Sequence, residues 1–226
     1  MSIVFIISAP SGSGKSTLVN ELRRSVPNLK FSISYTTRPP RGSEHNGNEY
    51  YFITRQEFED MLARDEFLEH ADVFGNYYGT AKRFLREARE AGTDLLLDID
   101  VQGAKQIKEK LPEAISIFVL PPSRKELEQR LRRRSHAEGV DREDVIQRRL
   151  HTASKEIENY PNYDYILVND RLEQSIDDLK AIVLAERFKH CGTPLAGDAQ
   201  RVMATAERCR RCNVRENIDS ILASFA

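Results

Sequence analysis

The chain has 226 residues, is 40% hydrophobic and 31% charged, and carries a formal net charge of −1 at pH 7. The near-neutral charge gives no general case for nucleic-acid binding, and the ordinary composition excludes low-complexity and fibrous proteins. The apolar runs are too short to span a bilayer, and the chain shows no secretory signal pattern. We therefore expect a cytoplasmic protein with no membrane or nucleic-acid partner.

Short apolar runs recur along the chain and predict the strands of a parallel sheet. They lack the polar alternation of a half-exposed strand and lie at residues 3–8, 94–99, 115–120 and 165–168. Helical patterns separate or follow these runs at residues 16–25, 80–91, 102–111, 123–134, 142–160 and 172–190. Strands that alternate with helices predict an α/β fold with helices on the sheet.

The stretch "SAPSGSGKST", residues 8–17, directly follows the first apolar run. It nearly fits the pattern G-x-x-x-x-G-K-[ST], with Ala9 in place of the first glycine, which requires a φ that alanine can adopt. A chance turn of small residues with a solvated lysine is the alternative. The strand before the loop and the helix after it favour a phosphate-binding loop.

The residue types in this loop suit phosphate chemistry. Gly12 and Gly14 permit positive φ, so that backbone N–H groups can surround an anion at the helix N-terminus. Lys15 would reach the outer phosphates, and the Ser16 hydroxyl would ligate Mg²⁺. The sequence therefore predicts that the loop binds the phosphates of a nucleotide.

Residues 31–53 interrupt the alternation of strands and helices. Apolar and polar residues alternate over residues 31–35 and predict a strand, and turn signals follow at Pro39-Pro40 and Asn46-Gly47. We expect a small, mainly β insertion that runs to about residue 79.

Arg38 and Arg41 flank the two prolines of this insertion. Two guanidinium groups on a stiff turn suit a phosphate, although an isolated arginine pair is usually a solvated surface. Neighbouring tyrosines could add hydroxyl donors, and we expect at least one of each adjacent pair to pack in the core instead. These pairs are Tyr50 with Tyr51 and Tyr77 with Tyr78.

Asp98 and Asp100 follow the second apolar run in "LLDID". Ligands collect at the carboxyl ends of parallel strands, so these carboxylates are candidate ligand contacts. Capping of the strand end is the alternative.

Taken together, the motifs resemble the guanylate kinase family, nucleoside monophosphate kinases that use ATP to phosphorylate GMP or dGMP. The resemblance covers about residues 1–190 and rests on "SAPSGSGKST", "SISYTTRPPRGSEHNGNEYYF", "FLEHADVFGNYYGT", "LLDIDVQG", "RLRRR…QRRL" and "ILVND". It implies a P-loop NTPase core with a parallel sheet flanked by helices at residues 1–33 and 80–190, with a helical lid at about 124–155. It also implies a GMP-binding insertion at residues 34–79, and it leaves 191–226 as an extension of unknown role.

For the acceptor nucleotide, the resemblance implies that Ser34 and Glu69 read the guanine base, supported by Thr80. It implies that Glu44 orients the arginines that hold the GMP phosphate. The implied phosphate contacts are Arg38, Arg41, Tyr50 and Tyr78, and Asp98 and Asp100 lie where the acceptor nucleotide meets the metal.

For ATP, the resemblance implies contacts from the loop, from lid arginines and from Asn169 near the adenine, with Mg²⁺ and no tightly bound organic cofactor. The loop residues are Ala9, Pro10, Ser11, Gly12, Ser13, Gly14, Lys15, Ser16 and Thr17, and the lid arginines are Arg130, Arg134 and Arg149. The implied catalytic residues are Lys15, Arg38, Arg134 and Arg149. Arg132 and Arg133 fall off the matching positions, as on a solvated helix face, and the turn around Gly139 suits a lid tip.

The stretch "PRGSE" departs from the more usual P-R-x-G-E of the family, because Gly42 precedes the expected position and Ser43 occupies it. If position 43 needs a positive φ, Ser43 is mildly strained. This departure bears on the pose of Glu44.

Two alternative functions remain. Other P-loop kinases act on AMP, UMP, dTMP or a sugar phosphate, but they lack "TTRPPR" and a guanine-reading carboxylate. Guanylate-kinase-like modules of scaffold proteins bind phosphorylated peptides, but they generally lack an intact phosphate loop. A GTPase switch is disfavoured because no N-K-x-D motif occurs.

Residues 191–226 extend beyond the resemblance. Cys209 and Cys212 form one C-x-x-C, and His190 and Cys191 could complete four zinc ligands. Because His190 and Cys191 are adjacent, we favour unpaired cysteines in a reducing compartment. One predicted helical face could dock on the domain or join subunits of a homo-oligomer, and it comprises Ile218, Ile221, Leu222 and Phe225.

Overall fold

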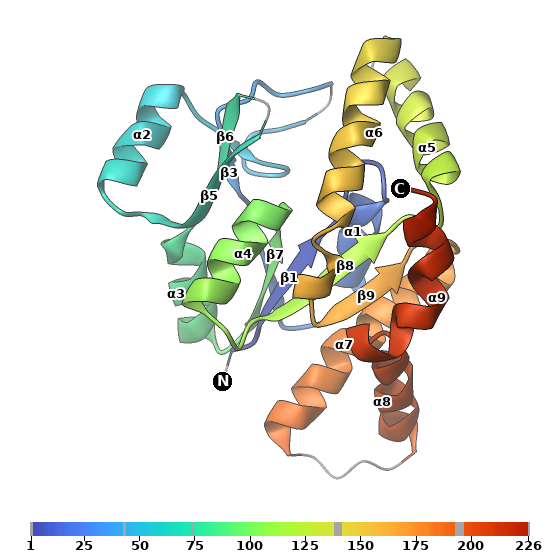
Figure 1. The fold of residues 1–226 in the computed structure, drawn as a ribbon. Coiled ribbons are helices and arrows are strands. Elements are labelled where there is room, and N and C mark those ends of the chain that lie inside the picture. The colour runs from blue at the N-terminus through green and yellow to red at the C-terminus, as the bar shows by residue number, and fades with distance from the viewer. Residues whose placement is uncertain (1, 43, 74, 138–141, 193–196, 226) are drawn as a thin grey trace. The chain divides into compact units, whose positions relative to one another are not determined.

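The computed structural model describes residues 2–42, 44–73, 75–137, 142–192 and 197–225 (Figure 1). The chain forms two compact units, a first unit of Met1–Ile6 with Asn28–Ile115 and a second of Ile7–Pro27 with Ser116–Ala226. A five-stranded sheet has the strand order β2-β7-β1-β8-β9, and β1 (Val4–Ser8) is its central strand. The predicted α/β fold with a parallel sheet flanked by helices is confirmed.

In the first unit, β2 (Leu29–Ser32) pairs in parallel with β7 (Asp94–Asp98). Leu95, Leu96 and Leu97 are fully buried, as expected for a parallel strand covered on both faces. Helix α3 (Lys82–Ala91) packs on β7, and α4 (Val101–Lys110) follows that strand. The predicted helix at 80–91 begins two residues late because Thr80 and Ala81 still belong to a strand.

A second sheet in the same unit has the order β4-β3-β6-β5. Its strands are β3 (Tyr35–Thr36), β4 (Tyr51–Phe52), β5 (Phe67–Val73) and β6 (Asn76–Ala81). The predicted mainly β insertion also contains helix α2 (Arg55–Ala63), which the sequence analysis missed. A signal was available, because Thr54 and Glu57 form a capping box at its N-terminus.

The single strand predicted over residues 31–35 is wrong. β2 ends at Ser32 and β3 begins at Tyr35 in the other sheet. The buried members of the alternation are the polar ones, Ser32, Ser34 and Thr36. The alternation predicts that the apolar residues face the interior, but in the structure the polar residues do so.

In the second unit, β8 (Ile115–Leu120) and β9 (Tyr165–Val168) pair in parallel and have the predicted bounds. Helices α1 (Lys15–Ser25) and α7 (Leu172–Cys191) pack on each other. Helices α5 (Arg124–Ala137) and α6 (Glu143–Ile157) form a second packed pair (Figure 1). A 3-10 turn at Tyr160–Asn162 leads into β9.

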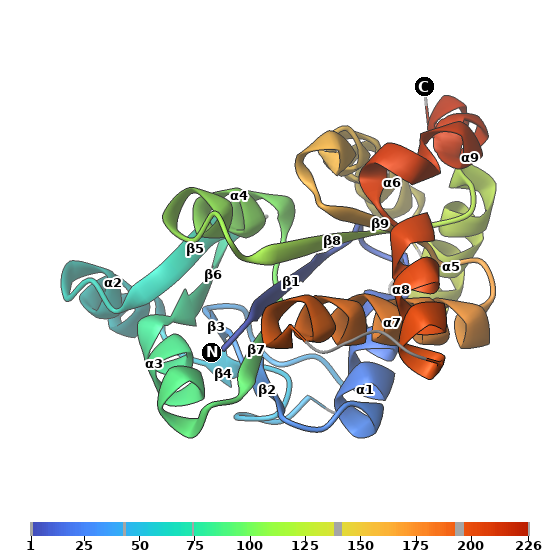
Figure 2. The same cartoon turned by 90° about the horizontal axis from the view of Figure 1, so that it is seen from below.

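The C-terminal segment folds onto the second unit as α8 (Asp198–Arg208) and α9 (Arg211–Ala223). The sequence analysis did not predict α8, which lies beside α7 in both views (Figures 1 and 2). Ile218, Ile221 and Phe225 of the predicted helical face are buried within the chain. Of its two expected uses, docking on the chain itself is therefore the one observed.

Across the described ranges, no helix combines the length and the apolar character needed to cross a membrane.

Candidate functional site

The loop between β1 and α1 has a backbone suited to an anion. Gly12 and Gly14 have φ of 93° and 87°, and Gly14 caps α1 in the left-handed conformation. The described non-glycine residues with positive φ are Asn28 and Asp65, so Ala9 has an ordinary backbone. The alanine in place of the first glycine is therefore accommodated without backbone strain.

Neighbouring side chains approach both glycines of the loop so closely that no β-carbon would fit unless they moved. A β-carbon on Gly12 would come within 3.0 Å of Leu131 in α5, and one on Gly14 would overlap the Asn169 amide. Asn169 is buried, and its Nδ2 donates a hydrogen bond to the Ser13 carbonyl oxygen at 2.7 Å. The structure thus brings the predicted residue Asn169 to the predicted loop.

The remaining loop residues lie at the start of α1. Lys15 is half-buried, and Ser16 and Thr17 are exposed in the first turn, where helical N–H groups have no intrahelical acceptor. The buried Ser13 hydroxyl has no hydrogen-bond partner among the described residues. An exposed serine hydroxyl is a hard oxygen ligand, so Ser16 fits a magnesium–phosphate group. Pro10 is buried and Ser11 is exposed in the same loop.

The predicted lid arginines lie on α5 and α6. Arg130 donates to the Asn169 carbonyl oxygen at 3.2 Å and to Glu126 at 3.0 Å. Arg134 is exposed on α5 and Arg149 is half-buried on α6. Gly139, the predicted lid tip, lies outside the described residues.

Arg132 has 42% of its side chain exposed, in keeping with a solvated helix face, but it is not without partners. Its guanidinium makes ion pairs with Glu128 on α5 and Glu143 on α6, both at 2.6 Å, and so ties the two helices together. Arg133 is exposed, as expected.

In the first unit, the two faces of the four-stranded sheet carry different sets of side chains. Thr36 pairs with Tyr78, and Glu69 pairs with Thr80. Cross-strand partners share a face, and residues two apart on a strand share it too. Thr36, Glu69, Tyr78 and Thr80 therefore line one face, which we call the polar face.

A β-bulge turns Glu69 onto the polar face. Phe67 pairs with Ala81, whereas Glu69 pairs with Thr80, so Leu68 is the additional residue. Thr80 and Ala81 are consecutive and point to opposite faces, and their partners must do the same. Phe67 instead stacks on Phe58, with 4.3 Å between ring centroids.

Glu69 lies in a buried polar cluster with Ser34 and Thr80. All three are under 9% exposed, and the Ser34 and Thr80 hydroxyl oxygens are 3.3 Å apart. Burial and the negative charge of Asp100 raise the pKa of Glu69 to about 7, although hydrogen bonds from Thr80 and the charge of Lys110 oppose the rise.

Asp98 ends β7 and Asp100 precedes α4, and both are half-buried. Asp100 Oδ1 accepts a hydrogen bond from the Gly103 N–H at 2.8 Å and so caps α4. Asp100 therefore caps a helix, and its charge also acts on Glu69.

Arg38 is 6% exposed, and its guanidinium is held from several sides. Its two terminal nitrogens donate to the two carboxylate oxygens of Glu44 at 2.8 and 3.0 Å, and Nε donates to the Tyr78 hydroxyl at 3.2 Å. Its centre lies 5.3 Å from the Tyr50 ring centroid. Burial of Glu44 opposes its ionisation, but hydrogen bonds from Arg38 and the Arg41 N–H outweigh this and lower its pKa.

The two tyrosine pairs divide between the faces because adjacent strand residues point in opposite directions. Tyr50 and Tyr78 lie at Arg38. Tyr51 stacks on Tyr35 at 4.9 Å, and Tyr77 lies 5.2 Å from Phe58. One tyrosine of each pair thus packs on another ring, although Tyr51 and Tyr77 are half-buried and do not belong to the fully buried core.

The neighbouring turn carries the other predicted residues. The side chain of Arg41 is exposed. Gly42 has a φ of 51°, so in this chain the left-handed conformation occurs at the glycine. Ser43 lies outside the described residues.

Among the residues that the structure describes, no three or more His, Cys, Asp or Glu side chains form a group that could hold a metal ion. Cys191 and Cys212 are exposed, while Cys209 is buried, and burial raises the pKa of its thiol to about 12. The histidine and cysteines of the tail therefore form no zinc site of that kind.

Comparisons with known proteins agree on one family. A guanylate kinase family model matches residues 1–186. A guanylate kinase of Koribacter versatilis (strain Ellin345) is 61% identical over 222 residues, which cover 98% of this chain and 95% of that protein. A guanylate kinase of Escherichia coli (strain K12) is 48% identical over 188 residues, covering 82% of this chain and 89% of that protein.

A crystal structure of guanylate kinase from Anaplasma phagocytophilum superposes with a TM-score of 0.67 and 31% identity, covering 97% of this chain and 94% of that one. The resemblance inferred from the sequence motifs is thus confirmed by sequence and by structure. The chain belongs to the guanylate kinase family and is a phosphotransferase.

Proposed function

We propose that this chain transfers a phosphoryl group from ATP to GMP, and also to dGMP, in cytoplasmic purine nucleotide metabolism. The observation that carries the proposal is the buried carboxylate of Glu69, held by Thr80 beside Ser34. Guanine presents N1–H and N2–H₂ as adjacent donors, and an ionised carboxylate can accept from both. Adenine presents an acceptor at N1, which cannot donate to the carboxylate. A site built in this way can favour guanine over adenine by about 10⁴-fold.

Arg38 and Arg41 would bind the GMP phosphate, with hydroxyl donors from Tyr50 and Tyr78. The ion pair between Arg38 and Glu44 supports this role, because it orients the guanidinium before the nucleotide arrives. Asp98 and Asp100 would lie where the acceptor nucleotide meets the metal. Residues 34–79 would form the GMP-binding insertion.

The loop of residues 8–17 would bind the ATP phosphates, with Asn169 near the adenine. Lys15, Arg130, Arg134 and Arg149 would neutralise phosphate charge, and residues 124–155 would serve as the lid of a core formed by 1–33 and 80–190. Ser16 would hold Mg²⁺, which when bound neutralises phosphate charge and orients the phosphate chain. The function requires no tightly bound organic cofactor.

The reaction would be a direct in-line displacement. A phosphate oxygen of GMP forms a bond to the γ-phosphorus of ATP while the bond to the leaving oxygen of ADP breaks. No general base is needed, because the attacking phosphate oxygen is already anionic. Alignment and charge neutralisation by Lys15, Arg38, Arg134 and Arg149 would supply the rate acceleration.

The test is ADP formation by the purified protein with ATP and Mg²⁺, comparing GMP, AMP, UMP and dTMP as acceptors. Turnover with GMP alone is expected. Turnover with another acceptor would keep the kinase but overturn the assignment of the insertion. GMP binding without turnover would favour a phosphopeptide-binding module.

A variant tests the loop separately. Lys15→Met is expected to lose most turnover while GMP binding, measured by calorimetry, survives. Near-normal turnover by Lys15→Met would show that the loop does not hold the transferred phosphate.

A further inference from the structure

The C-terminal segment adds residues to the exposed edge of the parallel sheet. β9 is the last strand in the sheet order, and Arg210 forms an antiparallel bridge with Tyr165 at its start. The Ile166 N–H donates to the Cys209 carbonyl oxygen at 2.9 Å, and the Arg211 N–H donates to that of Asp164 at 3.1 Å. The "CRRC" stretch therefore satisfies backbone groups that an edge strand would leave open.

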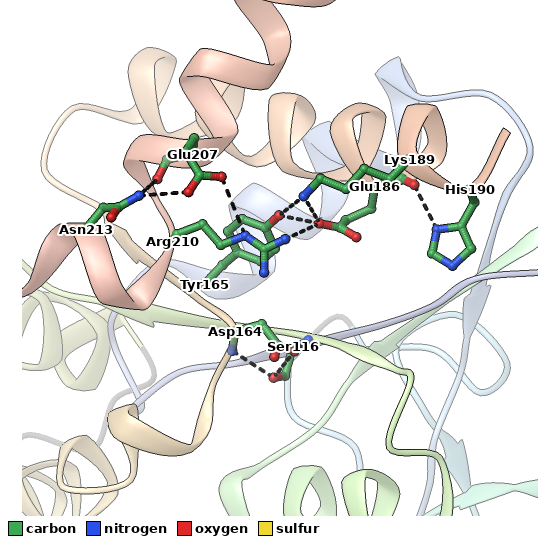
Figure 3. A network of polar contacts seen from close by, with 9 residues as sticks. All are labelled: Ser116, Asp164, Tyr165, Glu186, Lys189, His190, Glu207, Arg210 and Asn213. Carbon is green, nitrogen blue, oxygen red and sulfur yellow. Dashed lines mark hydrogen bonds and ion pairs between the residues drawn. The ribbon is translucent and has the colours of Figure 1, made fainter. Parts of the chain in front are cut away.

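Arg210 anchors this contact in a polar network around the buried carboxylate of Glu186 (Figure 3). Its guanidinium lies 4.5 Å from the Tyr165 ring centroid and donates to Glu186 Oε1 at 3.0 Å. The Glu186 side chain is only 5% exposed, and it also accepts from Lys189 at 2.8 Å and from the Tyr165 hydroxyl. Two cations and a hydroxyl thus surround one buried carboxylate, and Arg210 links the tail to α7 and β9.

The other end of the tail reaches the helix that carries the lid arginines. Ser224 follows α9, and its hydroxyl oxygen accepts a hydrogen bond from the Arg124 N–H at 3.0 Å. Arg124 is the first residue of α5, where backbone N–H groups have no acceptor within the helix. The buried side chains of Ile221 and Phe225 fix this end of α9.

Both contacts of the tail involve elements that carry proposed ATP-binding residues. β9 continues into Asn169, whose amide holds the Ser13 carbonyl of the phosphate loop. α5 carries Arg130, which donates to the Asn169 carbonyl. The tail thus contacts the strand and the helix whose residues meet at Asn169.

We propose that residues 198–225 position the ATP-binding residues of this enzyme, with Arg210 and Ser224 as positioning residues. The inference rests on the proposed function, because the proposed function assigns ATP binding to the phosphate loop and to α5. It requires that disturbing either contact weakens nucleotide binding on the ATP side and leaves GMP binding unchanged.

The experiment compares full-length Arg210→Ala and Ser224→Ala with the wild type. We expect the KM for ATP and the Kd for Mg²⁺–ADP to rise about tenfold, with the KM for GMP within about twofold of the wild-type value. Ser224→Thr retains a hydroxyl acceptor and is expected to restore the affinity. Arg211→Ala removes the exposed neighbouring arginine and serves as the matched control, with unchanged constants.

Circular dichroism and thermal unfolding show whether each variant folds, and Ser224→Ala retains the Arg210 anchor if Arg210→Ala does not fold. A lowered melting temperature with unchanged ATP and ADP constants would overturn the proposal, as would an equal loss of ATP and GMP affinity. The Kd for Mg²⁺–ADP is measured without any nucleotide that accepts the phosphoryl group. The proposal can therefore be tested even if GMP proves not to be the substrate.

Discussion

The carboxylate of Glu69 lies against the α-carbon of Gly103, where a β-carbon would come within 3.0 Å of Glu69 Cδ and still closer to Oε2. Gly103 stands in the first turn of α4, where glycine costs about 1 kcal/mol relative to alanine. Glycine at this position leaves room for the buried carboxylate.

Gly103→Ala is therefore expected to displace Glu69 and raise the KM for GMP about tenfold or more, with the KM for ATP within about twofold. Steady-state kinetics with each substrate varied in turn measure this split. Adding Gly103→Ala to Glu69→Gln should cost little more than Glu69→Gln alone, because both changes act on one contact. Gln102→Ala, an exposed neighbour, is the control, and full additivity in the double variant would contradict the explanation.

The raised pKa of Glu69 makes stability depend on pH. Glu69 titrates near 7 in the folded protein and near 4.5 in the unfolded chain, so between these values the folded state binds more protons. The free energy of unfolding therefore falls as pH rises from about 4.5 to about 7, by about 3 kcal/mol in total. Urea unfolding measures the free energy of unfolding of Glu69→Gln minus that of the wild type. This difference should be more favourable to the variant at pH 8 than at pH 5. An equal difference at both pH values would refute the raised pKa of Glu69.

GMP binding should show the opposite dependence on pH. The ionised carboxylate accepts from guanine, so affinity should fall toward tenfold per pH unit below about 7, and binding near pH 7 should release a proton. Calorimetry in two buffers with different ionisation enthalpies measures this proton. Glu69→Gln retains the titration of the GMP phosphate but should lose this release, and equal release by both proteins would exclude Glu69 as its source.

The two parallel hydrogen bonds from the Arg38 guanidinium to the Glu44 carboxylate predict the effect of Glu44→Gln. The amide replaces one of two charged acceptors, so the free energy of unfolding should fall by about 1–3 kcal/mol and the KM for GMP should rise about tenfold. Glu49→Gln changes an exposed carboxylate of the same loop but keeps an oxygen that can accept from the His45 N–H, so it should leave both quantities nearly unchanged. Denaturation and kinetics with varied GMP test the pair, and a change confined to ATP would contradict the assignment.

Asn169→Ala tests the link between β9 and the phosphate loop. It removes the donor to the Ser13 carbonyl oxygen, and the KM for ATP should rise about tenfold while that for GMP stays within about twofold. Asp170→Ala, at the exposed next position, is the matched control. Unchanged ATP kinetics in Asn169→Ala would show that the loop keeps its conformation without this contact.

Much of the fold could be predicted from local patterns. β8 and β9 have the predicted bounds, because buried parallel strands form mostly apolar runs, and these two runs end at Pro121 and Asn169. The phosphate loop was recognisable because its glycines, lysine and serine are consecutive in the chain. Glycine permits the positive φ that Gly12 and Gly14 adopt, although Gly79 and Gly103 do not adopt one.

The polar face of the four-stranded sheet could not be predicted from local patterns. Ser34 and Thr80 are buried together by cross-strand pairing, and a bulge at Leu68 turns Glu69 toward them. Nothing local to residues 67–69 marks the bulge, because strand register is decided by the partner strand. The family resemblance named these residues without giving the geometry that joins them.

The sequence by itself determined the α/β class, the phosphate loop and the family, because the loop is one continuous motif and the other two rest on short local patterns that follow one another along the chain. Only the tertiary structure decided where the tail lies and what it contacts. Its cysteine motif resembled a metal site, yet Cys209 and Arg210 contact β9 and Glu186. The local pattern marked the apolar face of α9, but the contact of Arg210 with Glu186 depends on how the whole second unit packs.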